Sequence, residues 1–172
     1  MRGRNNKIQG VFNMYKKYLV ITIVLIFMLS VTAGCEQKSA QVPAEAKWKI
    51  QVTGKDVDKT LTDVDMEKLG PVDARIAMLK KDGSTEGHDW TGVPLSKVLE
   101  SAGIREFEKV VLESSDGYKT ELPKDVALAE NTLVAYKMDG KDLPEGDGPV
   151  RMVVDGQPSK MWARALVKIS VE

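Results

Sequence analysis

The sequence contains a single cysteine, Cys35, and a single histidine, His88. One cysteine excludes a disulfide within the chain and a zinc site built on paired cysteines. One histidine restricts Ser-His-Asp catalysis to His88, and the chain has no phosphate-binding loop, metalloprotease helix or Gly-x-Ser-x-Gly elbow. Because these motifs are missing, we assign no catalytic residue and no metal ligand from motifs.

Beyond the N-terminal segment, the chain also has no excess of positive charge. Residues 1–34 carry five basic side chains and no acidic ones, whereas residues 35–172 carry 20 Lys and Arg against 25 Asp and Glu. Binding of DNA or RNA needs clustered basic side chains that neutralise phosphates. The sequence therefore predicts no nucleic-acid partner.

Residues 1–34 have the order of an export signal. Two lysines precede an apolar run over residues 18–29, and small residues follow it up to Cys35. The run is shorter than the roughly 20 apolar residues of a membrane-spanning helix. Residues 33–35 (Ala-Gly-Cys) resemble the bacterial lipobox, although Thr32 stands where leucine is usual. We therefore expect a lipid on Cys35 that anchors the protein to the cell membrane, facing outside the cytoplasm; the alternative is an uncleaved signal anchor.

The remainder of the chain divides into a tether and one domain. Residues 35–46 are polar and are predicted to be a flexible tether, and residues 47–172 have the length of one domain. Strands are predicted over residues 48–52, 57–61, 74–80, 109–113, 118–122, 132–138, 150–154 and 161–171, short helices over 63–69, 95–102 and 123–129, and a polar loop over 82–87. This pattern favours an α+β fold, in which a single domain has a mixed β-sheet and short helices at its edges.

The most informative stretch is a Trp-x-Gly-Val-Pro-Leu corner at residues 90–95. Pro94 suits the first turn of a helix, because it has no N–H to lose there. Four apolar residues with helical spacing follow from Leu95, and Gly103 can adopt the left-handed conformation that ends a helix. Trp90 is expected to pack in this corner rather than to stack on a ligand.

This corner and its helix resemble the oxidoreductase molybdopterin-binding domain, the central domain of the sulfite oxidase family. Further matches follow in the order that the family uses them, at residues 115–118, 133–136, 139–140, 143, 148–154 and 168–171. The resemblance covers roughly residues 47–172 and implies the fold of that domain, with molybdopterin as the cofactor.

One departure from the family pattern concerns the metal. In catalytic members, a cysteine thiolate upstream of the Trp-x-Gly corner ligates the molybdenum, and the corresponding strand here, residues 74–80, contains no cysteine. A thioether or a carboxylate does not replace a soft anionic thiolate. The resemblance therefore implies an oxidoreductase-like module that binds a cofactor, a small ligand or a redox partner, and it leaves open whether the chain is an enzyme.

His88 is the first of four residues that we select as candidate cofactor-binding residues. It lies in a segment that, in the resembled family, borders the cofactor face. It is a metal or haem ligand, an acid or base, or an ordinary solvated residue, and Met78 or Met161 can complete an axial pair with it.

Arg151 is the second candidate, because it matches an arginine of the family. A guanidinium can bind an oxyanion of substrate or cofactor in a bidentate manner. The alternative is that Arg151 pairs with Asp147 or Asp116 and fixes the loops.

Lys160 and Trp162 complete the candidate set. If residues 161–171 form a strand, Lys160, Trp162 and Arg164 share one face. Two cations beside an indole can hold an anionic, planar ligand such as a pterin phosphate. The alternative is an exposed strand face on which cation stems cover the tryptophan.

Two functions of other classes stay open from the sequence. The domain is either a structural or interaction domain of the cell envelope without a small ligand, or a haem- or metal-binding module that uses His88. The first is compatible with the acidic composition of residues 35–172.

Overall fold

The computed structural model describes residues 46–172. The predicted signal sequence, Cys35 and nearly all of the predicted tether lie outside these residues. One compact unit contains the described part of the chain. Within residues 46–172, no helix has the length and apolar character needed to cross a membrane.

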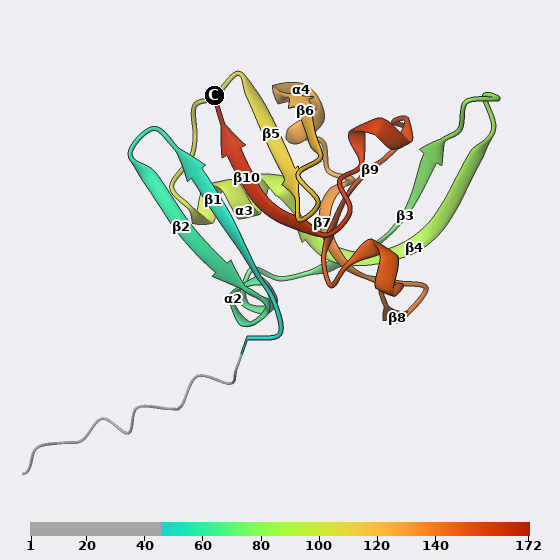
Figure 1. Cartoon of the computed structure of the whole chain (residues 1–172), viewed down its shortest axis with the longest axis horizontal. Helices are drawn as coiled ribbons and strands as arrows, with labels where there is room; N and C mark the ends of the chain where they lie inside the picture. Colours follow the sequence, from blue (N-terminus) through green and yellow to red (C-terminus); the bar gives the residue numbers. More distant parts are fainter. Residues whose placement is uncertain (1–45) are drawn as a thin grey trace, which may run out of the picture. The chain divides into compact units, whose positions relative to one another are not determined.

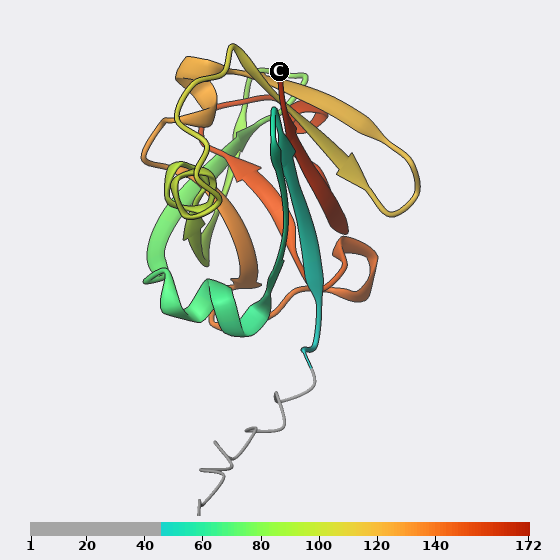
Figure 2. The same ribbon diagram turned by 90° about the vertical axis from the view of Figure 1, so that its left-hand side faces the viewer.

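Five strands form the first sheet, which we call sheet A (Figure 1). Their order is β2 (Val57–Thr62), β1 (Lys49–Gly54), β10 (Leu166–Val171), β5 (Lys109–Ser114) and β6 (Lys119–Pro123). β1 and β10 run parallel and lie next to each other (Figure 2), whereas the other neighbours are antiparallel. β10 therefore joins two hairpins, β1–β2 and β5–β6, into one sheet.

The second sheet, sheet B, is antiparallel and is centred on β7. Its strands are β3 (Val72–Leu79), β4 (Thr85–Pro94), β7 (Thr132–Met138), β8 (Lys141–Asp142) and β9 (Arg151–Val154). β4 pairs with one edge of β7, and β8 and β9 pair with the other. The β3–β4 hairpin extends away from sheet A (Figure 1).

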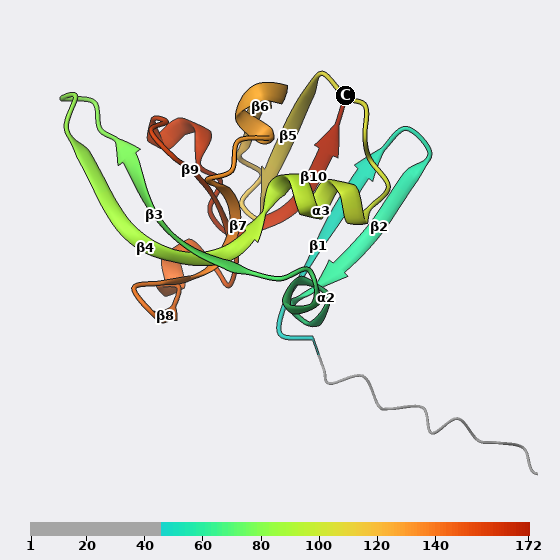
Figure 3. The ribbon, with the colours of Figure 1, turned by 180° about the vertical axis from the view of Figure 1, so that it is seen from behind.

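The helices are short and lie at the ends of strands. They are α2 (Asp63–Lys68), α3 (Leu95–Ser101) and α4 (Lys124–Ala127), together with the 3-10 helices η2 (Glu145–Asp147) and η3 (Ser159–Met161). α2 begins with a capping box, in which the Thr62 hydroxyl accepts the Asp65 N–H and the Asp65 carboxylate accepts the Thr62 N–H. α3 runs from β4 toward the β1–β2 hairpin (Figure 3), where the Lys59 ammonium donates to the Ser101 carbonyl at 2.6 Å.

The centre of the core lies where β7 meets β9. The first four residues of β7 and all four of β9 are buried. Consecutive buried residues mean that both faces of these strands are covered. Arg151 is the first residue of β9 and is therefore buried in the domain rather than placed on its surface.

Gly92 explains why the corner has a glycine at this point. A Cβ at Gly92 would lie 2.5 Å from the Val134 carbonyl oxygen and 2.7 Å from Ala135 Cα. The register between β4 and β7 also shifts between Thr91 and Gly92. Glycine thus permits the close approach of two backbones that holds Trp90 against β7.

The structure confirms the predicted α+β class with short helices and corrects three details. The strands form two sheets rather than one. The predicted loop over residues 82–87 is shorter than expected, because β4 begins at Thr85 and its polar residues pair with β3. His88 and Trp90 therefore lie within a strand. Residues 161–171 are not one strand, since η3 ends at Met161 and β10 begins at Leu166.

Candidate functional site

A buried arginine lies at the centre of the candidate site. Arg151 is 7% exposed, and its guanidinium carbon lies 5.2 Å from the ring centroid of Trp90 and 5.4 Å from that of Trp162. The two indoles meet edge to face, with centroids 5.8 Å apart and planes at 70°. A cation over desolvated indole faces gains about 2 kcal/mol from each good contact. The two tryptophans therefore form a cage around the charge.

Asp147 supplies the counter-charge. Arg151 Nη1 donates to Asp147 Oδ2 at 2.6 Å, and Arg164 Nε lies 3.2 Å from Asp147 Oδ1. Burial lowers the pKa of Arg151, and Asp147 acts in the opposite direction, so the guanidinium stays charged. Of the two predicted partners of Arg151, Asp147 is correct and Asp116 is not.

Backbone contacts fix Asp147 in place. The Ala165 N–H donates to the Asp147 carbonyl at 2.7 Å, and Gly148 follows with a φ of 73°. A Cβ at Gly148 would lie 2.6 Å from Ala165 Cα, so only glycine fits there without displacing the backbone. The loop after β8 is thus held against the segment before β10.

Three N–H donors around Arg151 have no hydrogen-bond partner within the described residues. They are Trp90 Nε1, Trp162 Nε1 and Arg151 Nε, and each is buried. An unpaired buried donor costs about 1–3 kcal/mol. Such donors need an acceptor, which a bound ligand or water supplies.

These donors belong to residues that line one small cavity, which we call the arginine cavity. Its volume is about 240 Å³. The lining residues are Met78, Glu86, His88, Trp90, Met138, Asp147, Arg151, Trp162 and Arg164. Three of the four candidate residues, His88, Arg151 and Trp162, therefore lie around a shared space.

His88 is held in place by two carboxylates. Its Nδ1 lies 2.8 Å from Asp139 Oδ2, and its Nε2 lies 3.5 Å from Glu86 Oε1. The Asp89 N–H donates to the other Asp139 oxygen at 3.0 Å. The bond to Asp139, and then that to Glu86, raises the pKa of His88, although partial burial lowers it. The Asp89 N–H, and then the bond to His88, lower the pKa of Asp139.

Lys160 lies outside the arginine cavity. It is exposed on η3 and lines a separate depression with Lys109 and Met161, and its carbonyl accepts the Tyr118 hydroxyl at 2.7 Å. The predicted face shared by Lys160, Trp162 and Arg164 is wrong, because the chain forms η3 there and Trp162 is 5% exposed.

Asp139, Glu86 and Met138 were missed as parts of the site. Trp90 is directly opposite Met138 in the β4–β7 register, and His88 follows Glu86 along the same face of β4. Only the Asp139-Gly140 turn was a signal, since it places a carboxylate at the end of β7. In the described part of the chain, no three His, Cys, Asp or Glu residues are grouped to hold a metal ion.

A family model, a curated protein and a solved structure match this chain. The family described as the oxidoreductase molybdopterin binding domain matches residues 39–172. The uncharacterized oxidoreductase YuiH of Bacillus subtilis (strain 168) is 41% identical over 66 residues, which make up 37% of this chain and 33% of that protein. The crystal structure of the sulfane dehydrogenase SoxCD from Paracoccus pantotrophus matches with a TM-score of 0.65 and 17% identity, over 72% of this chain and 38% of that chain. Both matches cover well under half of the relative's length, and the structural likeness concerns the fold.

Replacing Asp147 by asparagine tests the buried ion pair. Asp147→Asn leaves the Arg151 guanidinium buried without a counter-charge, so we expect the free energy of unfolding to fall by about 3–5 kcal/mol. Asp89→Asn is the matched control, because Asp89 pairs with Arg75 on the surface and its loss costs about 1 kcal/mol or less. Urea unfolding followed by tryptophan fluorescence measures the stability of both variants. Equally small losses of stability in the two variants would contradict a buried ion pair between Arg151 and Asp147.

The pH dependence of stability tests the contacts of His88. A raised pKa in the folded state means that His88 stabilises the domain fully below its ordinary value of 6.5, and that this stabilisation is lost as the pH rises through the raised value. We therefore expect the wild type to be more stable than His88→Gln by the largest margin at about pH 5.5, and this margin to shrink toward about pH 9. A difference that does not change over this range would refute the interpretation.

Proposed function

Because the chain belongs to the oxidoreductase molybdopterin-binding domain family, we propose that it is a membrane-tethered, extracytoplasmic member of that family whose domain binds a small anion. In this proposal the anion occupies the arginine cavity, and the domain acts as a ligand-binding module rather than as a competent molybdenum enzyme. The proposal rests on the donors and charges of that cavity.

The observation that carries the proposal is the set of unpaired donors. Trp90 Nε1, Trp162 Nε1 and Arg151 Nε are buried around one cavity, and no acceptor in residues 46–172 reaches them. A carboxylate or a small oxyanion can accept several such bonds at once, and charge-assisted bonds of this kind are strong.

The charge balance of the cavity also favours an anion. Arg151 and Arg164 share the single carboxylate of Asp147, so one positive charge remains. Glu86 lines the same cavity, but the Lys80 ammonium lies 2.9 Å from its carboxylate and neutralises it.

The family implies molybdopterin, and the donors present do not fit that cofactor with its metal. The only cysteine, Cys35, is outside the domain, and β3 offers no thiolate for molybdenum. The cavity, at about 240 Å³, is also smaller than the about 300–1,000 Å³ of typical ligand sites. A small oxyanion fits these donors better.

Purification from a host that makes molybdopterin tests this proposal. We expect the exported, processed chain to contain molybdenum and pterin at far less than one per chain, and to bind inorganic sulfate in calorimetry. Metal analysis and the fluorescence of released pterin measure the first; the host's own molybdenum enzymes show that the cofactor is made. Pterin at near one per chain would refute the proposal, and absence of both pterin and sulfate binding would favour a structural envelope domain.

Two tryptophan variants locate the anion. Trp162→Phe keeps an aromatic ring and removes one donor, so sulfate affinity should fall about tenfold. Trp48→Phe makes the same change outside the arginine cavity and should leave sulfate affinity unchanged. Equal effects of the two variants would contradict binding at this site.

Attachment to the membrane through Cys35 has its own test. We expect the wild type to incorporate labelled palmitate and to lose residues 1–34, because residues 33–35 resemble a lipobox. Cys35→Ser should incorporate no label, while Ser39→Ala in the predicted tether should behave as the wild type. A mature wild-type mass that retains residues 1–34 would indicate a signal anchor instead.

A further inference from the structure

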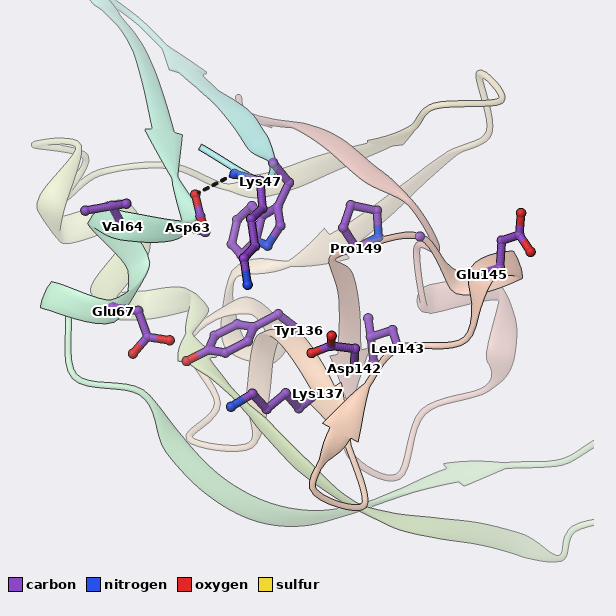
Figure 4. A pocket seen from close by; sticks show the side chains of 12 residues that line it. Lys47, Asp63, Val64, Glu67, Tyr136, Lys137, Asp142, Leu143, Glu145 and Pro149 are labelled. Atoms are coloured by element: carbon purple, nitrogen blue, oxygen red, sulfur yellow. Dashed lines mark hydrogen bonds between the residues drawn. The ribbon is translucent and has the colours of Figure 1, made fainter. Parts of the chain in front are cut away.

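A second cavity lies at the end of the domain where the described chain begins (Figure 4). Its volume is about 530 Å³, within the range of sites for small molecules. The lining residues are Lys47, Trp48, Asp63, Val64, Glu67, Tyr136, Lys137, Asp142, Leu143, Glu145, Gly148 and Pro149. We call it the aromatic cavity; none of these residues lines the arginine cavity.

Two aromatic rings from distant parts of the sequence form one wall. Trp48 immediately precedes β1, and Tyr136 belongs to β7. Their ring centroids are 6.0 Å apart with planes inclined by 39°, and both side chains are partly exposed. Leu143 and Pro149 lie across the cavity from Glu67, with Tyr136 between them (Figure 4). The cavity therefore combines aromatic faces with an apolar side.

The charges around these rings are mainly negative. Four carboxylates line the cavity against two ammonium groups. Within residues 46–172, Glu67, Asp142 and Glu145 form no ion pair, and Asp63 accepts only the Lys47 backbone N–H, at 3.2 Å. By contrast, both carboxylates of the arginine cavity are paired. The unpaired carboxylates are thus available to a cation from outside.

The ionisation of Tyr136 is consistent with a negative environment. Burial, followed by the nearby Glu67 carboxylate and by Asp73, raises the pKa of Tyr136 to about 12. The phenol therefore stays neutral, and its electron-rich ring lines the cavity. Such a face attracts cations and does not attract anions.

We propose that the aromatic cavity binds a small organic ammonium ion that carries an apolar body. The ammonium group lies against Trp48 and Tyr136, close to the Glu67 carboxylate, and the apolar body contacts Leu143 and Pro149. A metal ion would not use the aromatic and apolar surfaces, and an anion would meet the unpaired carboxylates. Because the two cavities share no lining residue, this site and the anion site of the arginine cavity succeed or fail separately.

Binding of two matched probes to the full-length chain tests the proposal. In a non-ionic detergent, we expect benzyltrimethylammonium to bind about tenfold tighter than benzyl alcohol, which has the same ring without the charge. Calorimetry gives the affinities, and chemical shifts of the tryptophan indole N–H groups show whether Trp48 responds while Trp90 and Trp162 do not. Equal affinities, or shifts at Trp90 and Trp162 alone, would overturn the proposal.

Three variants separate binding from folding. Glu67→Gln should weaken benzyltrimethylammonium binding about threefold, whereas Glu106→Gln, whose side chain is 94% exposed and does not line the cavity, should not. Trp48→Leu should weaken binding about tenfold and leave sulfate binding unchanged, which shows that the domain is folded. Unchanged ammonium affinity in both Glu67→Gln and Trp48→Leu would overturn the proposal.

Discussion

The ion pair between Arg151 and Asp147 is the interaction on which the candidate site depends. A guanidinium inside a core needs a counter-charge, because its desolvation costs several kcal/mol. Asp147 meets this need only while the loop after β8 stays closed on Ala165. The indoles of Trp90 and Trp162 then enclose the charge from two different parts of the sequence. One buried charge thereby fixes a strand, a loop and the segment before β10.

Local sequence patterns predict most of the fold and little of the site. Alternation of apolar and polar residues identifies β1, β-branched and aromatic content identifies β7, and Thr62 marks the start of α2. The strand over His88 has no such signal, because the β3–β4 hairpin is exposed on much of its surface and its residues are polar. The burial of Trp162 was also not predictable from the sequence, because it depends on η3 and on the packing of Arg151 from β9.

The partners of His88 show why the remainder of the site could not be predicted. Asp139 reaches His88 through the pairing of β4 with β7, which depends on long-range register. The pairing of Arg151 with Asp147 was predictable, because they are four positions apart across a tight turn. The aromatic cavity was not predictable either, because Trp48 and Tyr136 come together only after the strands of both sheets have assembled.

The position of β10 between β1 and β5 determines the order in which sheet A can form. A chain that emerges from its N-terminus presents the β1–β2 and β5–β6 hairpins well before residues 166–171 appear. Neither hairpin has its central neighbour until then, and isolated hairpins are marginal in water. Sheet A can therefore close only after residues 166–171 have emerged. Folding must wait for nearly the whole domain and should be slow, as expected for contacts between residues distant in sequence.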